Sequence, residues 1–454
     1  MIHTTTIRSE LESYLRKSGL TINQFADKSK VNSGTISTIL KGTRPIAMKQ
    51  LDLIVSAMGL PEGSFYGLYM NDCFDQSPNW RRLRPFLSRC AELDKLEYIQ
   101  KVVRLMMDNL SYIPALFDTA EELFNQGMQA AAAVIYESVA ESEKYQHSER
   151  LALCHYRLFC ISLGQDQERN LQAATKFEGF VERLDEVDQL DALKDLANTY
   201  LSLRQWSKVD ELAELMGRKA MIQYKYRYET SKRYDHPKEP KRPLFLYIVY
   251  SYLLRSAVCD ELGDYEQALR YVALYSDMSW VKEDSEEAQR IIEQYQLWAV
   301  ANTYLYQVMM GKAEVIPEYV AFIESKESEI IHALTKILQA SNRYDFNIDD
   351  ILHQFESQIS CYIDRKGMAI GTYTHQVEAD RYTSFLTELS SYYLSRGKYE
   401  SGIQCVLDGL ASATEIHNND AILKYVRLFE LFRHAASQEA QHRYHILISE
   451  VKGK

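Results

Sequence analysis

Apolar residues recur at steps of three and four positions along most of the chain, beginning at Ile7, Leu11 and Leu15. This spacing places them on one face of an α-helix, whereas a half-buried β-strand would need strict alternation. Proline, which interrupts helices, occurs only nine times in 454 residues and not at all after Pro317. The pattern therefore predicts an all-α fold, helical almost without interruption from about residue 94 to the end.

Two short amphipathic runs lie on either side of a tight turn between Gly19 and Pro45. Thr21 stands where it can cap the first run, and Asn32 or Ser33 can cap the second. The apolar positions spaced to meet in one small core are Phe25, Ala26, Val31, Ile36, Ile39 and Leu40. The pattern predicts a helix-turn-helix whose second helix turns small polar residues outward, where they could enter a DNA major groove. A small helical domain used only for protein contacts is the alternative.

The predicted DNA contacts of this stretch are of two kinds. Side chains at the start and along the second helix would contact base edges, and side chains of the turn that follows it would contact phosphates. The candidate residues are Gln24, Asn32, Ser33, Gly34, Thr35, Ser37, Thr38, Lys41, Thr43 and Arg44.

At these positions the chain resembles the lambda-repressor-like (XRE) helix-turn-helix family, over residues 5 to 66. The matching elements are Leu20-Thr21, Phe25-Ala26, Val31, Thr35-Ile36-Ser37, Lys41-Gly42-Thr43-Arg44-Pro45, Leu51-Asp52-Leu53-Ile54 and Ala57-Met58-Gly59-Leu60. The family often carries Gln where Ile22 stands here, and longer polar side chains than Ser33-Gly34. Base readout is therefore expected from Thr35, Ser37 and Thr38.

The helices after about residue 94 are predicted to come in pairs with a shared turn signature. A Gly or polar residue ends one helix, an aromatic follows, and a small residue opens the partner helix. Copies of this signature are 262–269 (LGDYEQAL), 396–402 (RGKYESG), 126–132 (QGMQAAA) and 204–209 (RQWSKV), with weaker copies at Gly164 and Gly311. They resemble the tetratricopeptide repeat, with a period of about 34 residues, which implies a right-handed α-solenoid with a concave inner face.

Three domains follow from these patterns. Residues 1–68 would form the helix-turn-helix domain, residues 69–93 a linker, and residues 94–454 the repeat domain that binds a ligand and dimerises. Within the linker, the cluster from Trp80 to Arg84 is expected to dock on the body more readily than to touch DNA. Two stretches interrupt the repeats. The basic, Tyr-rich residues 218–243 suggest a lengthened helix and solvated loop rather than a nucleic-acid patch, and residues 364–380 suggest a long connection or bent helix.

Charge is unevenly distributed along the chain. The net charge is −11, yet residues 1–66 hold eight Lys/Arg against five acids, a net of +3, and the rest carries −14. A small basic module on a large acidic body suits DNA binding by one end, with the body repelled from the phosphates. Because the positive excess is modest, we expect a homodimer.

Other function classes find little support in the sequence. No run of 18 uncharged apolar residues is present, and the start lacks the apolar core of a signal peptide, so we expect no membrane contact and a cytoplasmic protein. The seven cysteines contain no CxxC pair, which favours reduced, mostly buried thiols. No Walker loop, GxGxxG, HExxH or nucleophile elbow occurs, and His442 and His445 lack partners. We therefore expect no enzyme, no cofactor and no metal site.

A repeated tetrapeptide carries the prediction of a peptide site. Ala-Asn-Thr-Tyr occurs at 197–200 and at 301–304, each in the expected first helix of a repeat. An asparagine amide can donate to a peptide carbonyl and accept from a peptide N–H, so two on inner helices could hold an extended peptide by its backbone. The candidate residues are Asn198, Tyr200, Tyr250, Asn302, Tyr304, Tyr306, Glu388 and Ser391. The alternative is that both asparagines only make hydrogen bonds between helices.

An XRE helix-turn-helix followed by a long tetratricopeptide array resembles the RRNPP peptide-pheromone receptors of Firmicutes. By size and layout the chain is most similar to the subgroup with a DNA-binding domain and a full array, which includes the arbitrium-type receptors of phages and the arbitrium-like group in Paenibacillus. The resemblance implies a quorum-sensing transcriptional regulator, a homodimer whose arrays bind a short imported peptide and thereby alter binding to a double-stranded DNA operator. It also implies that inner-face Asn residues clamp the peptide backbone. The alternative function is a repeat protein that captures a partner protein, such as a response regulator.

Overall fold

The structure, a computed structural model, describes residues 6–75, 78–146, 148–164, 166–229, 238, 240–364, 372–416 and 418–451. Over this part of the chain it is all-α, with 24 α-helices, four short 3-10 helices and no strand. The chain divides into two compact units, Met1–Ile161 and Ser162–Lys454. The all-α prediction is confirmed, and each unit is considered by itself below.

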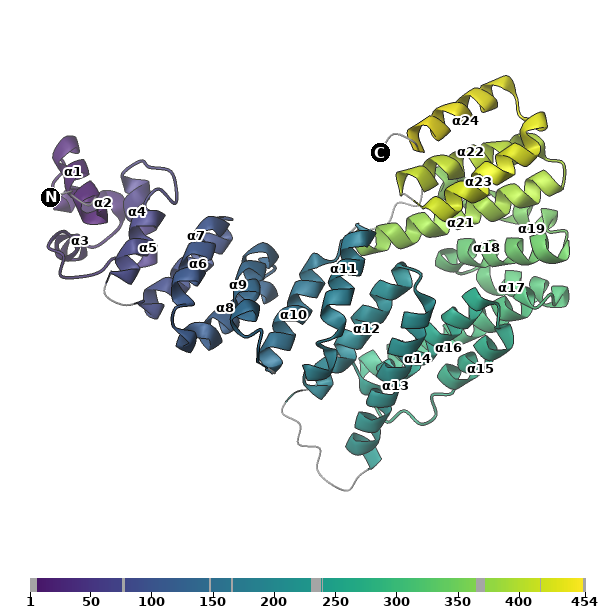
Figure 1. Cartoon of the computed structure of the whole chain (residues 1–454), viewed down its shortest axis with the longest axis horizontal. Helices are drawn as coiled ribbons and strands as arrows, with labels where there is room; N and C mark the ends of the chain where they lie inside the picture. Colours follow the sequence, from purple (N-terminus) through teal and green to yellow (C-terminus); the bar gives the residue numbers. More distant parts are fainter. Residues whose placement is uncertain are drawn as a thin grey trace. The chain divides into compact units, whose positions relative to one another are not determined.

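The first unit contains ten α-helices among its described residues, and Figure 1 shows them in order from the N-terminus. They are α1 (Ile7–Ser18), α2 (Ile22–Ser29), α3 (Ser33–Leu40), α4 (Met48–Ala57), α5 (Tyr66–Phe74), α6 (Trp80–Glu92), α7 (Leu96–Met106), α8 (Ile113–Asn125), α9 (Gln129–Ser142) and α10 (Glu149–Ser162), with the 3-10 helix η1 (Leu110–Tyr112).

Residues 69–93, expected to be a linker, are largely helical and packed. They fall mainly in α5 and α6, and α6 buries Leu83, Phe86 and Leu87 completely. The Phe86 ring makes an edge-on contact with Tyr66, with the ring centroids 5.2 Å apart. Apolar residues at helical spacing thus dock this segment on α5 and α7. Phe86 is fully buried, while Trp80 is half-buried.

The second unit contains the remaining described helices. They are α11 (Gln167–Glu178), α12 (Glu186–Ser202), α13 (Trp206–Glu229), α14 (Leu244–Leu262), α15 (Tyr265–Ser276), α16 (Glu286–Met309), α17 (Ile316–Ile323), α18 (Glu327–Tyr344), α19 (Asp349–Gln354), α20 (Glu356–Asp364), α21 (Thr372–Ser395), α22 (Tyr399–Glu415), α23 (Asn419–Phe432) and α24 (Gln438–Val451), with η2 (Val181–Arg183), η3 (Ala313–Val315) and η4 (Arg433–Ala435).

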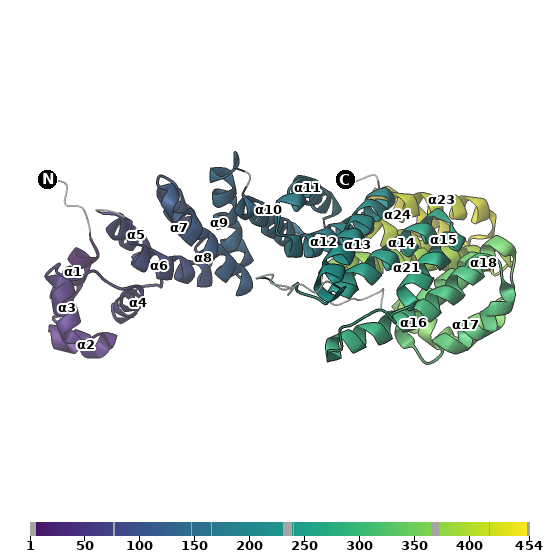
Figure 2. The ribbon, with the colours of Figure 1, turned by 90° about the horizontal axis from the view of Figure 1, so that it is seen from below.

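Consecutive helices of the second unit pack on one another, as Figures 1 and 2 show for α12 to α16. The predicted turn signature explains the junction of α14 and α15. Gly263 ends α14 in a left-handed conformation, with φ +74°, and Asp264 caps α15 by accepting from the Gln267 N–H at 3.0 Å. Ala268, the small residue of the signature, is completely buried. The packing is consistent with a helical solenoid.

Two predicted interruptions lie partly outside the described residues. In the stretch 218–243, α13 continues to Glu229, and residues 230–237 and 239 are not described. In the stretch 364–380, residues 365–371 are not described, and α21 begins at Thr372.

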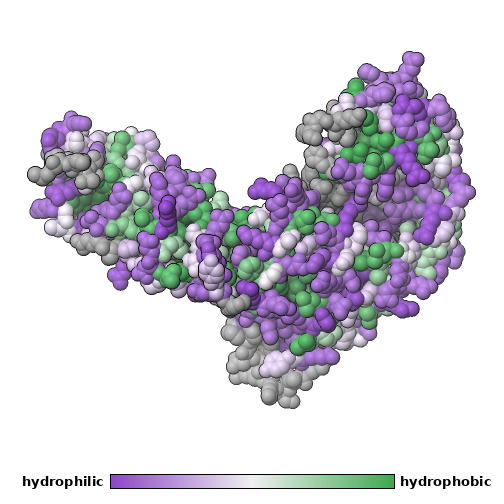
Figure 3. Space-filling model, in the orientation of Figure 1, coloured by the Kyte–Doolittle hydropathy of each residue, from purple (hydrophilic) through white to green (hydrophobic). Residues whose placement is uncertain are grey.

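The surface of the described chain is mixed. In the face shown in Figure 3, hydrophilic residues cover most of each unit and apolar residues form scattered patches. No helix in the described part combines the length and apolarity needed to cross a bilayer. All seven cysteines are free thiols, and four of them are buried.

Candidate functional site

The first candidate site is the predicted DNA-binding site, which comprises helices α2 and α3 and the turn after α3. Thr21 caps α2 through its side-chain oxygen, which accepts from the Gln24 N–H at 3.3 Å. Asn32, rather than Ser33, caps α3 by accepting from the Gly34 N–H at 2.9 Å. The apolar positions predicted to meet are buried, except Leu40, which is half-buried. α2 packs against α3 and α4, and α1 packs against α3.

The outward side of α3 carries small polar groups. Ile36 and Ile39 are buried, whereas Asn32 and Gly34 are exposed. The predicted base-contacting residues Ser33, Thr35, Ser37 and Thr38 are half-buried. The Thr38 hydroxyl donates to the Thr35 carbonyl within the helix, at 2.9 Å. The outward face of α3 therefore carries short polar side chains and no long one.

The turn after α3 is exposed and cationic. Lys41, Thr43 and Arg44 are all exposed, and no described carboxylate forms an ion pair with Lys41 or Arg44. Thr43 donates to the Thr38 carbonyl at 3.2 Å, which fixes the turn. Gln24 differs from these residues, because its amide oxygen accepts from the Thr21 backbone N–H at 2.9 Å in a capping box. Its side chain thus holds the start of α2.

Arg8 is a cation at this turn that the sequence analysis missed. A Cβ at Gly42 would lie 2.8 Å from Arg8 Nη1, so the guanidinium of α1 reaches the turn after α3 because residue 42 has no side chain. Arg8 also pairs with Glu12 in the next turn of α1, with Nε 3.0 Å from Oε1. The two residues are 34 positions apart in the sequence, and no local pattern links them.

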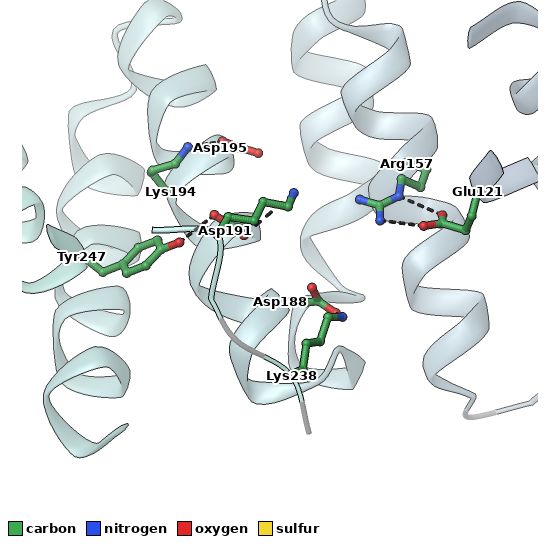
Figure 4. Close-up of polar contacts among 9 residues, drawn as sticks. Glu121, Arg157, Asp188, Asp191, Lys194, Asp195, Lys238 and Tyr247 are labelled. Carbon is green, nitrogen blue, oxygen red and sulfur yellow. Dashed lines mark hydrogen bonds and ion pairs between the residues drawn. The ribbon is translucent and has the colours of Figure 1, made fainter. Parts of the chain in front are cut away.

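In the second unit, a row of polar side chains joins α12 to α14, and we call it the polar strip: Asp191 and Asn198 of α12, Tyr247 and Tyr250 of α14. The Tyr247 hydroxyl donates to Asp191 Oδ1 at 2.8 Å, as Figure 4 shows. The Tyr250 hydroxyl donates to the Asn198 amide oxygen. Asn198 is half-buried, and its amide N–H₂ has no partner among the described residues. Asn198 and Tyr250, both predicted for the peptide site, are thus brought together.

Asp191 of the polar strip and the nearby Asp188 form ion pairs with lysines from a segment distant in the sequence. Asp188 and Asp191 side chains are only 8% and 5% exposed, and they pair with Lys238 and Lys241. Burial raises the pKa of Asp191, although the Tyr247 hydroxyl and Lys241 oppose that shift. Figure 4 shows Lys238 beside Asp188. In this part of the basic stretch 218–243, lysines therefore serve as partners for buried carboxylates.

Asn302 makes an inter-helix contact as well. Its amide N–H₂ donates to the Tyr275 hydroxyl of α15 at 2.8 Å, while its amide oxygen has no described partner. Both Asn198 and Asn302 thus make the inter-helix bonds that formed the alternative interpretation, and each keeps one end of its amide free among the described residues. They lie on α12 and α16, with α13, α14 and α15 between them in the chain.

Glu388 and Ser391 lie on α21, which packs against α18. Asn342 of α18 donates to the Glu388 side chain at 2.9 Å, and burial raises the pKa of Glu388. Ser391 donates within its own helix, to the Thr387 carbonyl at 2.8 Å. The facing side of α18 adds polar residues that no sequence motif identified, among them His332, Lys336 and Gln339. Lys336 pairs with Asp260 of α14, with the atoms 2.6 Å apart.

Three predicted tyrosines lie elsewhere. Tyr200 and Tyr306 are 2% and 3% exposed, and their hydroxyls donate to Glu178 and to the Ser256 carbonyl. Tyr304 packs its ring 5.7 Å from that of Tyr319 in α17. Residues two positions apart on a helix do not share a face, which separates Tyr200 from Asn198 and Tyr304 from Asn302. Tyr200 and Tyr306 therefore fill spaces between helices, whereas the half-buried Tyr304 also lines an open hollow between α15 and α16.

Neither a scan against models of known protein families nor a search of curated proteins found a match to this chain.

Proposed function

We propose that the chain is a cytoplasmic, peptide-responsive transcriptional regulator of the quorum-sensing type. In this proposal the first helices form a helix-turn-helix that binds double-stranded DNA, and the second unit binds a short peptide through Asn198 of the polar strip and through Asn302. The main observation that supports the proposal is the exposed turn Lys41–Arg44 directly after the capped helix α3. Cations without a described acidic partner, next to a helix with short polar side chains, suit binding to a DNA phosphate backbone. Nothing in this arrangement calls for a bound cofactor or metal.

The proposed peptide binding is supported by two asparagine side chains whose amide groups each keep a donor or an acceptor without a described partner. Asn198 and Asn302 keep a donor and an acceptor, respectively, without a described partner. An extended peptide presents N–H and C=O groups alternately and could use both. The tyrosine hydroxyls that hold these amides restrict their rotamers, so little side-chain entropy would be lost on binding.

Replacing Lys41 or Arg44 by alanine is expected to weaken DNA binding at every sequence and to lower the slope of log affinity against log salt by about one for each residue. The measurement is titration of a duplex from upstream of the protein's own gene at several salt concentrations. The control is Lys176→Ala, which removes the same charge from an exposed position on α11. Equal slopes for all three variants and the wild type would count against DNA binding by this turn.

Replacing Asn198 by alanine is expected to weaken binding of a peptide encoded beside the gene about tenfold, the effect of one or two lost hydrogen bonds, while DNA affinity without peptide changes by no more than about threefold. Isothermal titration with the synthetic peptide measures the first quantity. Asn125→Ala, at the exposed end of α8, is the control. Unchanged peptide affinity in a normally folded Asn198→Ala protein would remove this residue from the site.

A further inference from the structure

A polar cluster in the first unit connects α4 to α6. Arg89 of α6 places Nε 3.0 Å from Asp52 Oδ2 of α4. Its other nitrogens reach Glu92 on its own helix and Glu62 in the connection between α4 and α5. The hydroxyl of Tyr66, a fully buried residue at the start of α5, donates to the second Asp52 oxygen at 3.2 Å. One guanidinium, with five donors, therefore ties three segments together.

The connection that this cluster spans contains two glycines at which the backbone turns sharply. Gly59 and Gly63 both adopt left-handed backbone conformations, with φ +71° and +88°, on either side of Glu62. Glycine reaches such conformations without the steric cost that other residues bear, and a few such residues can absorb the rotation of a hinge. Within the connection Leu60 remains 37% exposed, whereas Phe65 and Tyr66 at its end are buried.

The charges of the cluster are unbalanced. Among the residues that the structure describes, Arg89 is the cation bonded to Asp52, Glu62 and Glu92, so without it three carboxylates would lie close together. Asp52 and Arg89 side chains are 22% and 29% exposed, which means that part of their hydration is lost in forming the pair. Burial raises the pKa of Asp52, and Arg89 lowers it in opposition. Removing the cation would thus replace attraction across the junction by repulsion.

We propose that Arg89 is the positioning residue of a hinge: it holds α1–α4 in one orientation on α5–α7, and releasing it lets the first four helices swing about residues 58–65. The inference rests on the proposed function, since the orientation of α3 matters only if α3 reads DNA. In a homodimer, recognition helices must stand about 34 Å apart to enter successive major grooves. A change at this hinge would alter that spacing with no change in any DNA-contacting side chain.

The test compares Arg89→Gln with Arg84→Gln in the full chain. Arg84 lies on the same helix and forms an exposed pair with Glu122, with side chains 53% and 44% exposed, so its loss should have little effect. Spin labels carried by non-natural amino acids at the exposed positions Lys17 and Gln129 report the distance between α1 and α9 by double electron–electron resonance. We expect one narrow distance distribution for wild type and Arg84→Gln, and a broadened or shifted one for Arg89→Gln.

A distribution that is already broad in the wild type, or that is the same in Arg89→Gln, would overturn the inference. If Arg89→Gln does not fold, raising the salt concentration on wild type from about 0.05 to 1 M should broaden the distribution, because screening weakens this partly exposed cluster. An unchanged distribution would again refute it.

A duplex titration on the same proteins separates the two proposals. Arg89→Gln should weaken DNA binding with an unchanged salt slope, whereas Lys41→Ala lowers the slope. A wild-type protein that binds no duplex defeats the proposed function, while the distance measurement still decides the hinge.

Discussion

Replacing Gly409 by alanine is expected to destabilise the second unit by about 2 kcal/mol. A Cβ at this position of α22 would lie 2.2 Å from Tyr425 Cζ and 2.3 Å from the Tyr425 hydroxyl oxygen. Tyr425 of α23 is fully buried, and its hydroxyl donates to the Thr383 carbonyl of α21 at 2.5 Å. Overpacking costs about 1–3 kcal/mol and the displaced hydrogen bond about 1, against which the higher helix propensity of alanine returns about 1.

Thermal and denaturant unfolding measure the Gly409 effect. The matched control is Gly179→Ala, where a Cβ would have no heavy atom within 4 Å, and it should be close to neutral. A double-mutant cycle adds Tyr425→Leu. Because the smaller side chain relieves the clash, the two substitutions together should cost less than the sum of their separate effects. Strict additivity would show that α22 and α23 do not meet at Gly409 as described.

The stability of the second unit is expected to fall as the pH drops below about 6.5, in part because of His332. Burial first, and then the nearby cations Lys336 and Arg381, lower the pKa of this imidazole from 6.5 to about 3. An unfolded His332 therefore takes up a proton near pH 6.5, while the folded one resists protonation until about pH 3. Between these values protons favour the unfolded chain, by up to about 1.4 kcal/mol per pH unit.

Comparing wild type with His332→Gln between pH 7 and pH 5 isolates this contribution. All other titrating groups are common to the two proteins, so the wild type should lose more unfolding free energy on acidification than the variant. His353→Gln is the control, because the His353 side chain is 87% exposed and pairs only at the surface with Glu356. A pH dependence identical in all three proteins would contradict the lowered pKa of the half-buried His332 beside Lys336 and Arg381.

In the proposed function, charged and polar residues of the second unit would contact the peptide. Asp191 and Asn198 on α12, Glu388 on α21 and Lys336 on α18 come from helices spread over about 200 residues. A ligand that prefers one arrangement of such helices shifts the population toward it, by as much as its affinities for the two arrangements differ. In the proposed function, that shift is what would reach the DNA-binding helices.

Local structure was accessible from the sequence. Thr21 and Asn32 cap α2 and α3 because a polar side chain before an apolar-periodic run can accept the free N–H groups at a helix start. Gly263 and Asp264 form the predicted turn between α14 and α15 for similarly local reasons. The linker expected at residues 69–93 is instead largely helical, because Leu83, Phe86 and Leu87 lie at helical spacing and are buried in α6.

The chain by itself determined that the fold is all-α, where α2 and α3 begin, and that the first 66 residues are basic while the rest is acidic, because these properties depend on neighbours within a few positions or on composition. Only the tertiary structure decided the partners of the polar groups. Arg8 at Gly42, Lys238 on Asp188, Tyr250 on Asn198 and Arg89 on Asp52 join positions 34 to 52 residues apart. Such pairs depend on how helices pack, and helical periodicity shows which face of a helix is buried without showing what lies against it.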